Sequence, residues 1–419
     1  MPPRPPPLPE PDAAARAASA QLAARIAERI RAAGGWIGFD AFMQAALYEP
    51  GLGYYGGATP RFGASGDFVT APGLGPQFGG CVAVQLAQWL DDDPRLARRV
   101  IEFGAGDGSL AADVLLALAD AGAPPVEYAI VELSGALRAQ QRATLRRRLG
   151  AQAPAQADAL LARVRWWDAL PDSIEGCIVG NELLDAMPVR LFRIARGGLH
   201  ERGVALDAAP AATADAVPRL VFADRPADAA FERAVAAALD EAMPAWRQDS
   251  ADPAFEYISE WPEQAAAWVA DVGARLARGA MLLVDYGFPR AELYHPQRAG
   301  GTLMSHRAHR AHPDVLQWPG LQDITAHVDF SAVAAAAAAA GLTLVGYTSQ
   351  ARFLLNTGLL DRVAQASAGD TVAHVRMLQA VQTLLSEAEM GELFKAIAFV
   401  RGTDVQAAGF SRGDRSGRL

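Results

Sequence analysis

The sequence predicts an α/β fold with helices on both faces of a parallel sheet. Three observations lead to this prediction: short apolar runs typical of strands, helical stretches between most of them, and a glycine-rich turn after the first run. Short apolar strands that alternate with helices are typical of a parallel sheet buried on both faces. The predicted strands are 100–103, 127–132, 163–167, 176–181, 280–286 and 342–347, and the helical stretches include 109–121, 134–149, 262–278 and 329–340.

The remaining sequence divides around this core. A long stretch dense in Gly, Pro and aromatic residues, 48–80, is too long for an ordinary connection and indicates a functional loop. The predicted segments are a disordered Pro-rich tail at 1–12, an N-terminal helical and loop-rich segment at 13–99, a core at 100–195 and 255–402, an insertion at 196–254, a Gly/Pro/His-rich insertion at 287–328 and a flexible tail at 403–419.

Composition excludes several classes of protein. The 419-residue chain is 51% hydrophobic, which excludes global disorder, and its net charge of −9 argues against nucleic-acid binding. Two cysteines, Cys81 and Cys177, are too few for a disulfide framework or a zinc site. The start is not a signal peptide, and the least polar window, 331–347, is too short to span a membrane. We therefore expect a cytoplasmic protein without membrane insertion. Lys395 is its only lysine.

The strongest local signal is VIEFGAGDG (100–108), a predicted strand that runs into three glycines and then a helix. Glycines at this point allow the backbone to approach a ligand at the crevice of an α/β sheet. Gly104, Gly106 and Gly108 follow the spacing GxGxG, not the GxGxxG of dinucleotide sites. With the acidic Glu102 before it, this turn favours S-adenosylmethionine, which has no pyrophosphate.

Acidic and amide side chains end the next three predicted strands. Glu132 is placed to accept hydrogen bonds from ribose hydroxyls, as acidic residues do in related nucleoside sites. Asp168 is predicted either to accept from an adenine amino group or to cap a helix. Asn181, Glu182 and Asp185 follow the fourth strand in GNELLDAMPVR, where carboxylates could bind and orient a cationic substrate group.

The histidines offer a weaker signal. HRAHRAH (306–312) spaces three histidines as a metal site on a helix would, but Pro313 argues against a helix and no carboxylate completes a metal signature. No metal is therefore predicted. His327 is a candidate proton acceptor for catalysis, and Asp329 is expected to help cap the helix that follows.

At these residues the chain resembles the MidA-like family, relatives of the mitochondrial complex I assembly factor that is a protein-arginine methyltransferase. The matching stretches span about residues 20–402. Four positions depart from the family: Gly73 and Gly80 stand where it often has acidic residues, and Ala105 and Asp107 stand where it often has Pro and Arg. The main matches are ALYEPGLGYY (46–55), GDFVTAP (66–72), EFGAGDG (102–108), NELLDAMPVR (181–190), LLVDYG (282–287), GTLMSHRAHRAH (301–312), PGLQDITAHVDF (319–330), TSQARFLLNTG (348–358) and LFKAIAF (393–399).

The resemblance implies a class I, Rossmann-like methyltransferase fold that uses S-adenosylmethionine. It implies that the N-terminal segment covers the cofactor through Gly66, Asp67 and Phe68, and that the two insertions lie on the substrate side. It implies that EFGAGDG seats the methionine part of the cofactor, and that Asn181 and Glu182 face the methyl group. The methyl acceptor would be an arginine of a protein substrate, with a respiratory-complex subunit as one candidate. This protein itself could assemble as a homodimer.

Two other functions remain open at this point. A nicotinamide-dependent oxidoreductase is disfavoured by the GxGxG spacing. It is also disfavoured by the last apolar run, 395–401, which is reached through helices and suits the reversed final strand of a methyltransferase. A non-catalytic assembly factor that binds the cofactor or only a protein partner is the second alternative, and Gly73 and Gly80 are the residues that keep it open.

Overall fold

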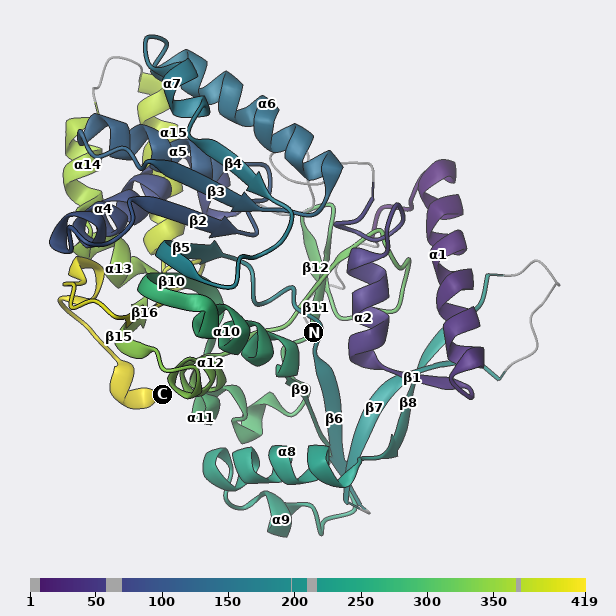
Figure 1. The fold of residues 1–419 in the computed structure, drawn as a ribbon. Coiled ribbons are helices and arrows are strands. Elements are labelled where there is room, and N and C mark those ends of the chain that lie inside the picture. The colour runs from purple at the N-terminus through teal and green to yellow at the C-terminus, as the bar shows by residue number, and fades with distance from the viewer. Residues whose placement is uncertain (1–7, 58–69, 197, 209–216, 367–370) are drawn as a thin grey trace. The chain divides into compact units, whose positions relative to one another are not determined.

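The computed structural model describes residues 8–57, 70–196, 198–208, 217–366 and 371–419 (Figure 1). They pack as two compact units, and each is described by itself. The sheet unit comprises Val69–Asp185, Ala266–Pro289 and Val328–Leu419. The accessory unit comprises Met1–Phe68, Ala186–Ala265 and Arg290–His327.

The sheet unit contains an eight-stranded sheet in the order β15-β16-β10-β5-β2-β3-β4, with β14 paired to β10. The run from β10 to β4 is parallel, and β16 is antiparallel to both of its neighbours. This confirms the predicted parallel sheet and its reversed last strand. The strands are β2 (Arg99–Phe103), β3 (Glu127–Val131), β4 (Val164–Trp167), β5 (Ile174–Asn181), β10 (Leu276–Phe288), β14 (Val328–Asp329), β15 (Thr343–Ser349) and β16 (Phe394–Arg401).

Helices cover both faces of this sheet, as the apolar strands require. Side chains of both alternating sets are buried: Cys177 and Val179 belong to the core shared with α4 and α5, and Ile178 between them is also buried. On the opposite face, Trp268 of α10 packs edge-on against Phe103. The helices are α3 (Ala71–Leu74), α4 (Pro76–Asp92), α5 (Ser109–Asp120), α6 (Gly135–Gln152), α7 (Ala157–Leu161), α10 (Glu263–Arg275), α12 (Phe330–Ala339), α13 (Gln350–Asn356), α14 (Leu359–Gln365) and α15 (Thr371–Leu385).

The last residues, 403–419, correct the prediction of a flexible tail. They include the 3₁₀ turns Ala408–Phe410 and Ser416–Arg418, and they run beside β15, the edge strand of the sheet. The N–H of Tyr347 donates to the Asp414 carboxylate (2.9 Å), and the N–H of Arg415 donates to the carbonyl of Tyr347 (2.6 Å). An edge strand leaves backbone groups unpaired, so this segment is ordered because it satisfies them.

Lys395 lies in β16 next to β10 and is only 3% exposed. Its ammonium donates to the carbonyl oxygens of Glu392 and Leu393 and lies 5.5 Å from the centre of the Phe288 ring. A buried ammonium needs such partners because its desolvation is costly. The single lysine of the chain is therefore part of the core of the sheet unit.

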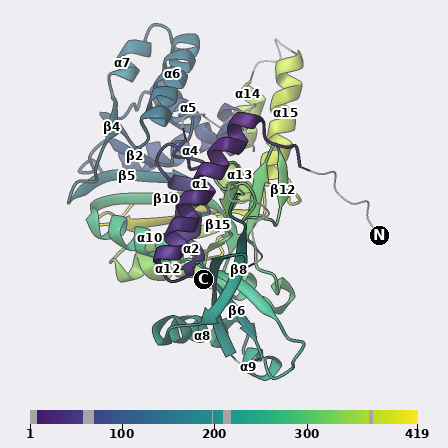
Figure 2. The same ribbon diagram turned by 90° about the vertical axis from the view of Figure 1, so that its right-hand side faces the viewer.

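The accessory unit has a five-stranded antiparallel sheet and a three-stranded one. In both views α8 and α9 lie near the lower end of β6 (Figures 1 and 2). Its elements are α1 (Ala13–Ala32), β1 (Trp36–Gly38), α2 (Phe39–Tyr48), β6 (Arg190–Ala195), β7 (Gly198–Leu206), β8 (Leu220–Pro226), α8 (Ala229–Ala242), α9 (Trp246–Asp249), β9 (Tyr257–Trp261), α11 (Arg290–Leu293), the 3₁₀ turn Pro296–Arg298, β11 (Met304–Arg307), β12 (Arg310–His312) and β13 (Asp323–Thr325).

The histidine-rich motif forms a β-hairpin in this unit. His306 lies in β11 opposite Ala311, His312 lies in β12 opposite Ser305, and His309 is in the turn with a φ of 59°. This geometry separates the three side chains that a helix would have aligned. Within the described ranges, no group of three or more His, Cys, Asp or Glu side chains is placed to hold a metal ion.

The two units divide the chain differently from the predicted segments. The N-terminal segment 13–99 is split, because its described residues up to 57 pack in the accessory unit whereas α3 and α4 pack in the sheet unit. The first excursion from the sheet begins at Ala186, ten residues before the predicted insertion, because β6 pairs with β7 and β9. Of the predicted disordered tail, residues 1–7 lie outside the description, and Asp12 caps α1.

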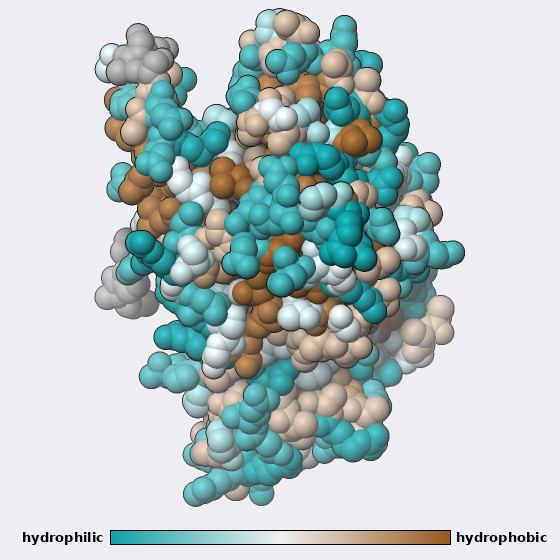
Figure 3. Space-filling view, turned by 60° about the vertical axis from the view of Figure 1, so that its left-hand side comes forward, coloured by the Kyte–Doolittle hydropathy of each residue, from teal (hydrophilic) through white to brown (hydrophobic). Residues whose placement is uncertain are grey.

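The surface shows a mixture of hydrophilic and hydrophobic side chains. Figure 3 shows hydrophobic side chains in small groups among hydrophilic ones on the face drawn. The exposed large hydrophobic residues of the sheet unit include Leu133 after β3 and Val372, Val375 and Leu378 on α15. Among the helices that the structure describes, none is long and apolar enough to cross a membrane.

Candidate active site

The glycine turn joins β2 to α5 at the carboxyl end of the parallel strands. Gly104, Gly106 and Gly108 have φ values of 66°, 51° and 85°, a region that side chains disfavour. A Cβ on Gly104 would lie 3.1 Å from the Leu183 side chain, and one on Gly108 would lie 3.1 Å from the Cα of Gln141. The three glycines therefore allow the turn to fit between the loop after β5 and helix α6.

Glu102 lies in β2 just before the turn, and its carboxyl group is in the core. It is 1% exposed and accepts a hydrogen bond from the Tyr128 hydroxyl (2.7 Å). Burial, helped by the nearby charges of Asp107 and Asp113 and opposed by the Tyr128 hydrogen bond, raises the pKa of Glu102 to about 8. The structure thus places Glu102 beneath the turn, bonded to β3, and its predicted contact with a cofactor stays a prediction.

Glu132 follows β3 and presents a half-buried carboxylate at the same edge of the sheet. One oxygen accepts from the N–H of Ser134 (2.8 Å) and the other from the side-chain amide of Gln141 (3.3 Å). Burial raises the pKa of Glu132, and these hydrogen bonds oppose the shift. The carboxylate is fixed in place by two donors, one for each oxygen.

Asp168 is brought close to the Glu132 loop by Arg138, a residue that sequence reasoning missed. The Arg138 guanidinium donates to the carbonyls of Glu132 (2.5 Å) and Trp167 (3.0 Å) and forms a 2.6 Å ion pair with Asp168. The Asp168 side chain is 86% exposed. Arg138 and Gln141 lie three residues apart on α6 and so point the same way, a spacing that could have revealed them.

The segment after β5 places Asn181 and Glu182 together. Glu182 has a φ of 49°, a left-handed conformation that is costly for a residue with a Cβ. Its carboxylate accepts from the Asn181 side-chain amide (3.0 Å) and from the N–H of Ala71 in α3 (3.2 Å). The carbonyl oxygen of the Asn181 side chain is buried and has no hydrogen-bond partner among the described residues.

Asp285 of β10, also missed by sequence reasoning, fixes this segment. One of its carboxylate oxygens accepts from the N–H groups of Leu183 (3.0 Å), Leu184 (2.8 Å) and Asp185 (3.4 Å). Asp185 is itself buried, and its carboxylate accepts from the Tyr286 hydroxyl (2.6 Å). Burial, and then the charge of Asp185, raise the pKa of Asp285. The two aspartates therefore position the segment that carries Glu182.

Four predicted site residues are not among the described residues of the sheet unit. Gly66, Asp67 and Phe68 are outside the described residues. His327 belongs to the accessory unit, where its N–H donates to the Thr302 hydroxyl (3.0 Å), while Asn181, Glu182 and Asp185 belong to the sheet unit.

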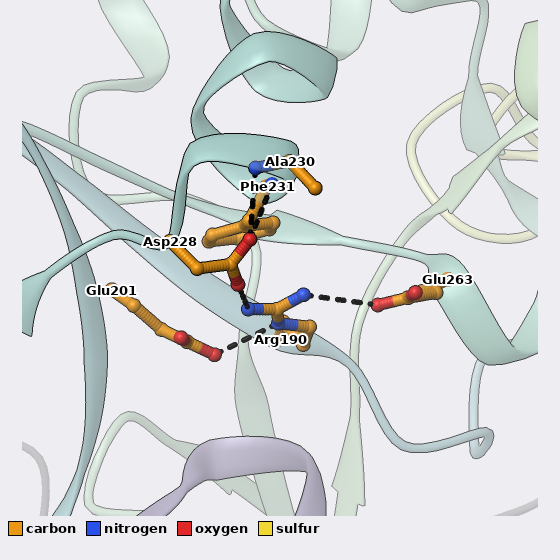
Figure 4. Close-up of polar contacts among 6 residues, drawn as sticks. All are labelled: Arg190, Glu201, Asp228, Ala230, Phe231 and Glu263. Atoms are coloured by element: carbon orange, nitrogen blue, oxygen red, sulfur yellow. Dashed lines mark hydrogen bonds and ion pairs between the residues drawn. The ribbon is translucent and has the colours of Figure 1, made fainter.

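Arg190, the last residue of the NELLDAMPVR motif, has structural partners in the accessory unit. Its guanidinium donates to Glu201 (2.8 Å), Asp228 (3.0 Å) and Glu263 (3.3 Å) and lies 3.7 Å from the centre of the Phe231 ring (Figure 4). Asp228 also caps α8. These contacts tie β6 to β7, to the N-cap residue of α8 and to Glu263, all within the accessory unit. The motif therefore begins in the sheet unit and ends in the accessory unit.

Comparison with known proteins decides the family. Residues 81–348 match the family described as "Putative S-adenosyl-L-methionine-dependent methyltransferase". The chain belongs to this family. A solved structure from Burkholderia thailandensis, bound to S-adenosyl-homocysteine, is 52% identical to this methyltransferase over 99% of this chain and 100% of that one, with a TM-score of 0.88.

More distant relatives carry a more specific name. "Protein arginine methyltransferase NDUFAF7, mitochondrial" from Danio rerio is 27% identical, with 88% of this chain and 84% of the relative covered. The Mus musculus protein of the same name is 28% identical, with 86% and 80% covered. The predicted class I fold, the methyltransferase activity and the cofactor S-adenosylmethionine are confirmed, and both alternative functions are set aside.

Proposed function

We propose that this methyltransferase transfers the methyl group of S-adenosylmethionine to a guanidinium nitrogen of an arginine in a protein. The observation that carries the proposal is Glu182, held in a left-handed conformation beside Asn181 at the carboxyl end of β5. Strained backbone persists where the surrounding structure imposes it, often at functional sites. Here the imposing contacts are the three N–H bonds to Asp285.

The residues at this edge fit the cofactor. The buried, unpartnered side-chain oxygen of Asn181 can accept from the ammonium of the methionine part, and the glycine turn offers its backbone at close range. Glu132 would accept from the ribose hydroxyls and Asp168 from the adenine amino group, with Leu133, 79% exposed, against the adenine ring. Bound there, the cofactor supplies an electrophilic methyl group on a sulfonium.

The acceptor would be held by charge and geometry. A guanidinium is a weak nucleophile because its lone pairs are delocalised, so its plane must be oriented toward the methyl group. The Glu182 carboxylate can accept two N–H bonds from such a group, and charge-assisted bonds of this kind are strong. A new N–C bond forms as the S–C bond breaks, S-adenosyl-homocysteine leaves, and the nitrogen then loses a proton to water.

The protein-arginine acceptor is supported by the name of the NDUFAF7 relatives. A protein substrate, a respiratory-complex subunit among the candidates, and a homodimeric assembly remain parts of the proposal. The expected cytoplasmic location is also a proposal, since those relatives are named mitochondrial.

A methyl-transfer assay tests this function. Radiolabelled S-adenosylmethionine is supplied with extract from cells lacking the gene, and labelled protein is hydrolysed to identify the methylated residue. We expect methylarginine with the wild-type protein and at least about a hundredfold less with Glu182→Gln, the loss typical of removing a transition-state contact. Glu175→Gln, an exposed glutamate of the same strand, is the matched control and should keep full activity. Label on another residue type, or unimpaired Glu182→Gln, would contradict the proposal.

A further inference from the structure

Helix α6 contributes a buried amide to the centre of the cofactor edge. Gln141 is 0% exposed and bonds to three segments that are distant in sequence. Its amide nitrogen donates to the carbonyl of Gly106 in the glycine turn (3.1 Å) and to the Glu132 carboxylate after β3 (3.3 Å). Its amide oxygen accepts from the indole N–H of Trp166 in β4 (2.8 Å). One side chain thus joins β2, β3 and β4 where they end.

The orientation of this amide is uniquely determined by its partners. An indole N–H can only donate, so the group that faces Trp166 must be the amide oxygen. A carbonyl and a carboxylate can only accept, so the NH₂ group must face Gly106 and Glu132. The opposite rotamer would set donor against donor at Trp166 and acceptor against acceptor at Glu132. Trp166 therefore keeps the donor side of Gln141 directed at Glu132.

This arrangement leaves the Glu132 carboxylate able to accept hydrogen bonds from two neighbouring hydroxyl groups. Each carboxylate oxygen has about two acceptor positions, and on Glu132 one oxygen already accepts from Ser134 and the other from Gln141. The side chain is half-buried, so its remaining acceptor positions can receive two neighbouring hydroxyls. Donors on both oxygens also favour the ionised carboxylate against the burial that raises its pKa.

Close packing of α6 against the glycine turn allows the Gln141 side chain to reach Gly106 and Glu132. Gln141 begins from a backbone so near the turn that a Cβ on Gly108 would lie 3.1 Å from its Cα. The third glycine of GxGxG thus has a second consequence, because it allows α6 to place Gln141 behind the turn. Trp166 in turn is covered by the Arg142 guanidinium, 4.4 Å from its ring centre.

We propose that Gln141, oriented by Trp166, is a positioning residue that fixes the Glu132 carboxylate for the two ribose hydroxyls of S-adenosylmethionine. The inference rests on the proposed ribose contact of Glu132 and extends it to residues that do not touch the cofactor's ribose themselves. A positioning role predicts that loss of Gln141 weakens recognition of the ribose hydroxyls specifically. A role in folding or in the glycine turn would weaken the whole cofactor site.

Calorimetric titration with two ligands tests the inference. The probes are S-adenosyl-homocysteine and its 2′,3′-dideoxy analogue, which lacks both ribose hydroxyls. Gln141→Met keeps the length and burial of the side chain but removes the donors. It should weaken S-adenosyl-homocysteine about tenfold, equivalent to about 1.4 kcal/mol, and the dideoxy analogue less than about twofold. Gln152→Met, the same change at an exposed position of α6, should alter neither affinity.

A second variant keeps the test decisive if Gln141→Met does not fold. Trp166→Phe preserves the ring under Arg142 and removes only the indole N–H, so that the amide can turn over. It should weaken S-adenosyl-homocysteine about threefold, and again spare the dideoxy analogue. Equal weakening of both ligands by either variant, or no weakening, would overturn the positioning role.

Glu132→Gln separates this inference from the proposal beneath it. If Glu132 binds the ribose, this variant loses affinity for S-adenosyl-homocysteine and not for the dideoxy analogue, and adding Gln141→Met to it has little further effect. If Glu132→Gln binds both ligands as the wild type does, the ribose assignment itself is wrong. If Glu132→Gln loses affinity only for S-adenosyl-homocysteine but adding Gln141→Met weakens that ligand by its full amount again, the ribose contact stands and the role of Gln141 is wrong.

Discussion

The left-handed conformation of Glu182 allows an unusual comparison between two substitutions. At an ordinary strand or helix position glycine is less stable than alanine, because it has more conformational freedom to lose on folding. At Glu182, with a φ of 49°, the order should reverse. Both Glu182→Gly and Glu182→Ala remove the carboxylate and its bonds to Asn181 and Ala71. Those losses therefore cancel when the two variants are compared.

What remains is the backbone. A residue with a Cβ in the left-handed region costs about 1–2 kcal/mol relative to the right-handed one, and glycine removes that cost. The greater freedom of glycine in the unfolded chain returns about 0.4–1 kcal/mol. The glycine variant should therefore be more stable than the alanine variant by about 0.8 kcal/mol, the difference between the midpoints of these two ranges. Both variants should lack methyl transfer, so the glycine variant gains stability without recovering function.

Urea unfolding followed by circular dichroism measures the difference. The control pair is Glu175→Gly and Glu175→Ala in β5, the strand that Glu182 follows. Glu175 is not among the residues with a positive φ. There alanine should be the more stable by about 0.5–1 kcal/mol. If alanine is also the more stable residue at position 182, Glu182 is not held in the left-handed region, and the account of its positioning by Asp285 is refuted.

Four further outcomes are expected. Because burial gives Glu102 a folded pKa of about 8, above the ordinary value of about 4.3, its contribution to stability is lost as pH rises from 4.3 toward 8. Glu102→Gln should flatten that fall in urea unfolding of the cofactor-free protein. Asp285→Asn should lower the methyl-transfer rate about tenfold or more, with S-adenosyl-homocysteine affinity within about twofold in calorimetry, since it loosens the loop and not the turn. Phe410→Ala should cost about 3 kcal/mol in thermal unfolding, because this tail residue is only 6% exposed. Gly79→Ala should cost about 1–3 kcal/mol in the same assay, because its Cβ would lie 2.5 Å from that of Asp113.

Periodicity and the glycine turn were sufficient to predict the sheet unit. Buried parallel strands are short and apolar, so the positions of Glu132, Asn181 and Glu182 at the ends of strands could be predicted from where the apolar runs stop. The reversal of β16 was expected from the reversed last strand of methyltransferases and not from periodicity, because a strand reached through helices is ordinarily parallel to the one before it.

Residues that act through tertiary contacts could not be found in this way. Asp285 is embedded in the apolar run LLVDYG, and Gln141 and Arg138 lie on a helix that carries many other polar residues, several of them exposed. The three-residue spacing places Arg138 and Gln141 on one side of α6, but what that side contacts is known only once the strands are paired. The tail was misjudged for a related reason: a polar, Gly- and Arg-rich composition suggests disorder, and only the unpaired edge of β15 explains why Asp414 and Arg415 are ordered.

Because Lys395 is buried, the folded chain should react little with amine-directed reagents. Apart from the α-amino group, no primary amine is offered to activated esters or aldehydes, because the only lysine ammonium is enclosed in the core of the sheet unit. Acylation of Lys395 therefore requires that β16 separate from its surroundings. A pulse of an amine-reactive reagent, read by mass spectrometry, would report the opening of this sheet in the unmodified protein, with no engineered probe and no background from surface lysines.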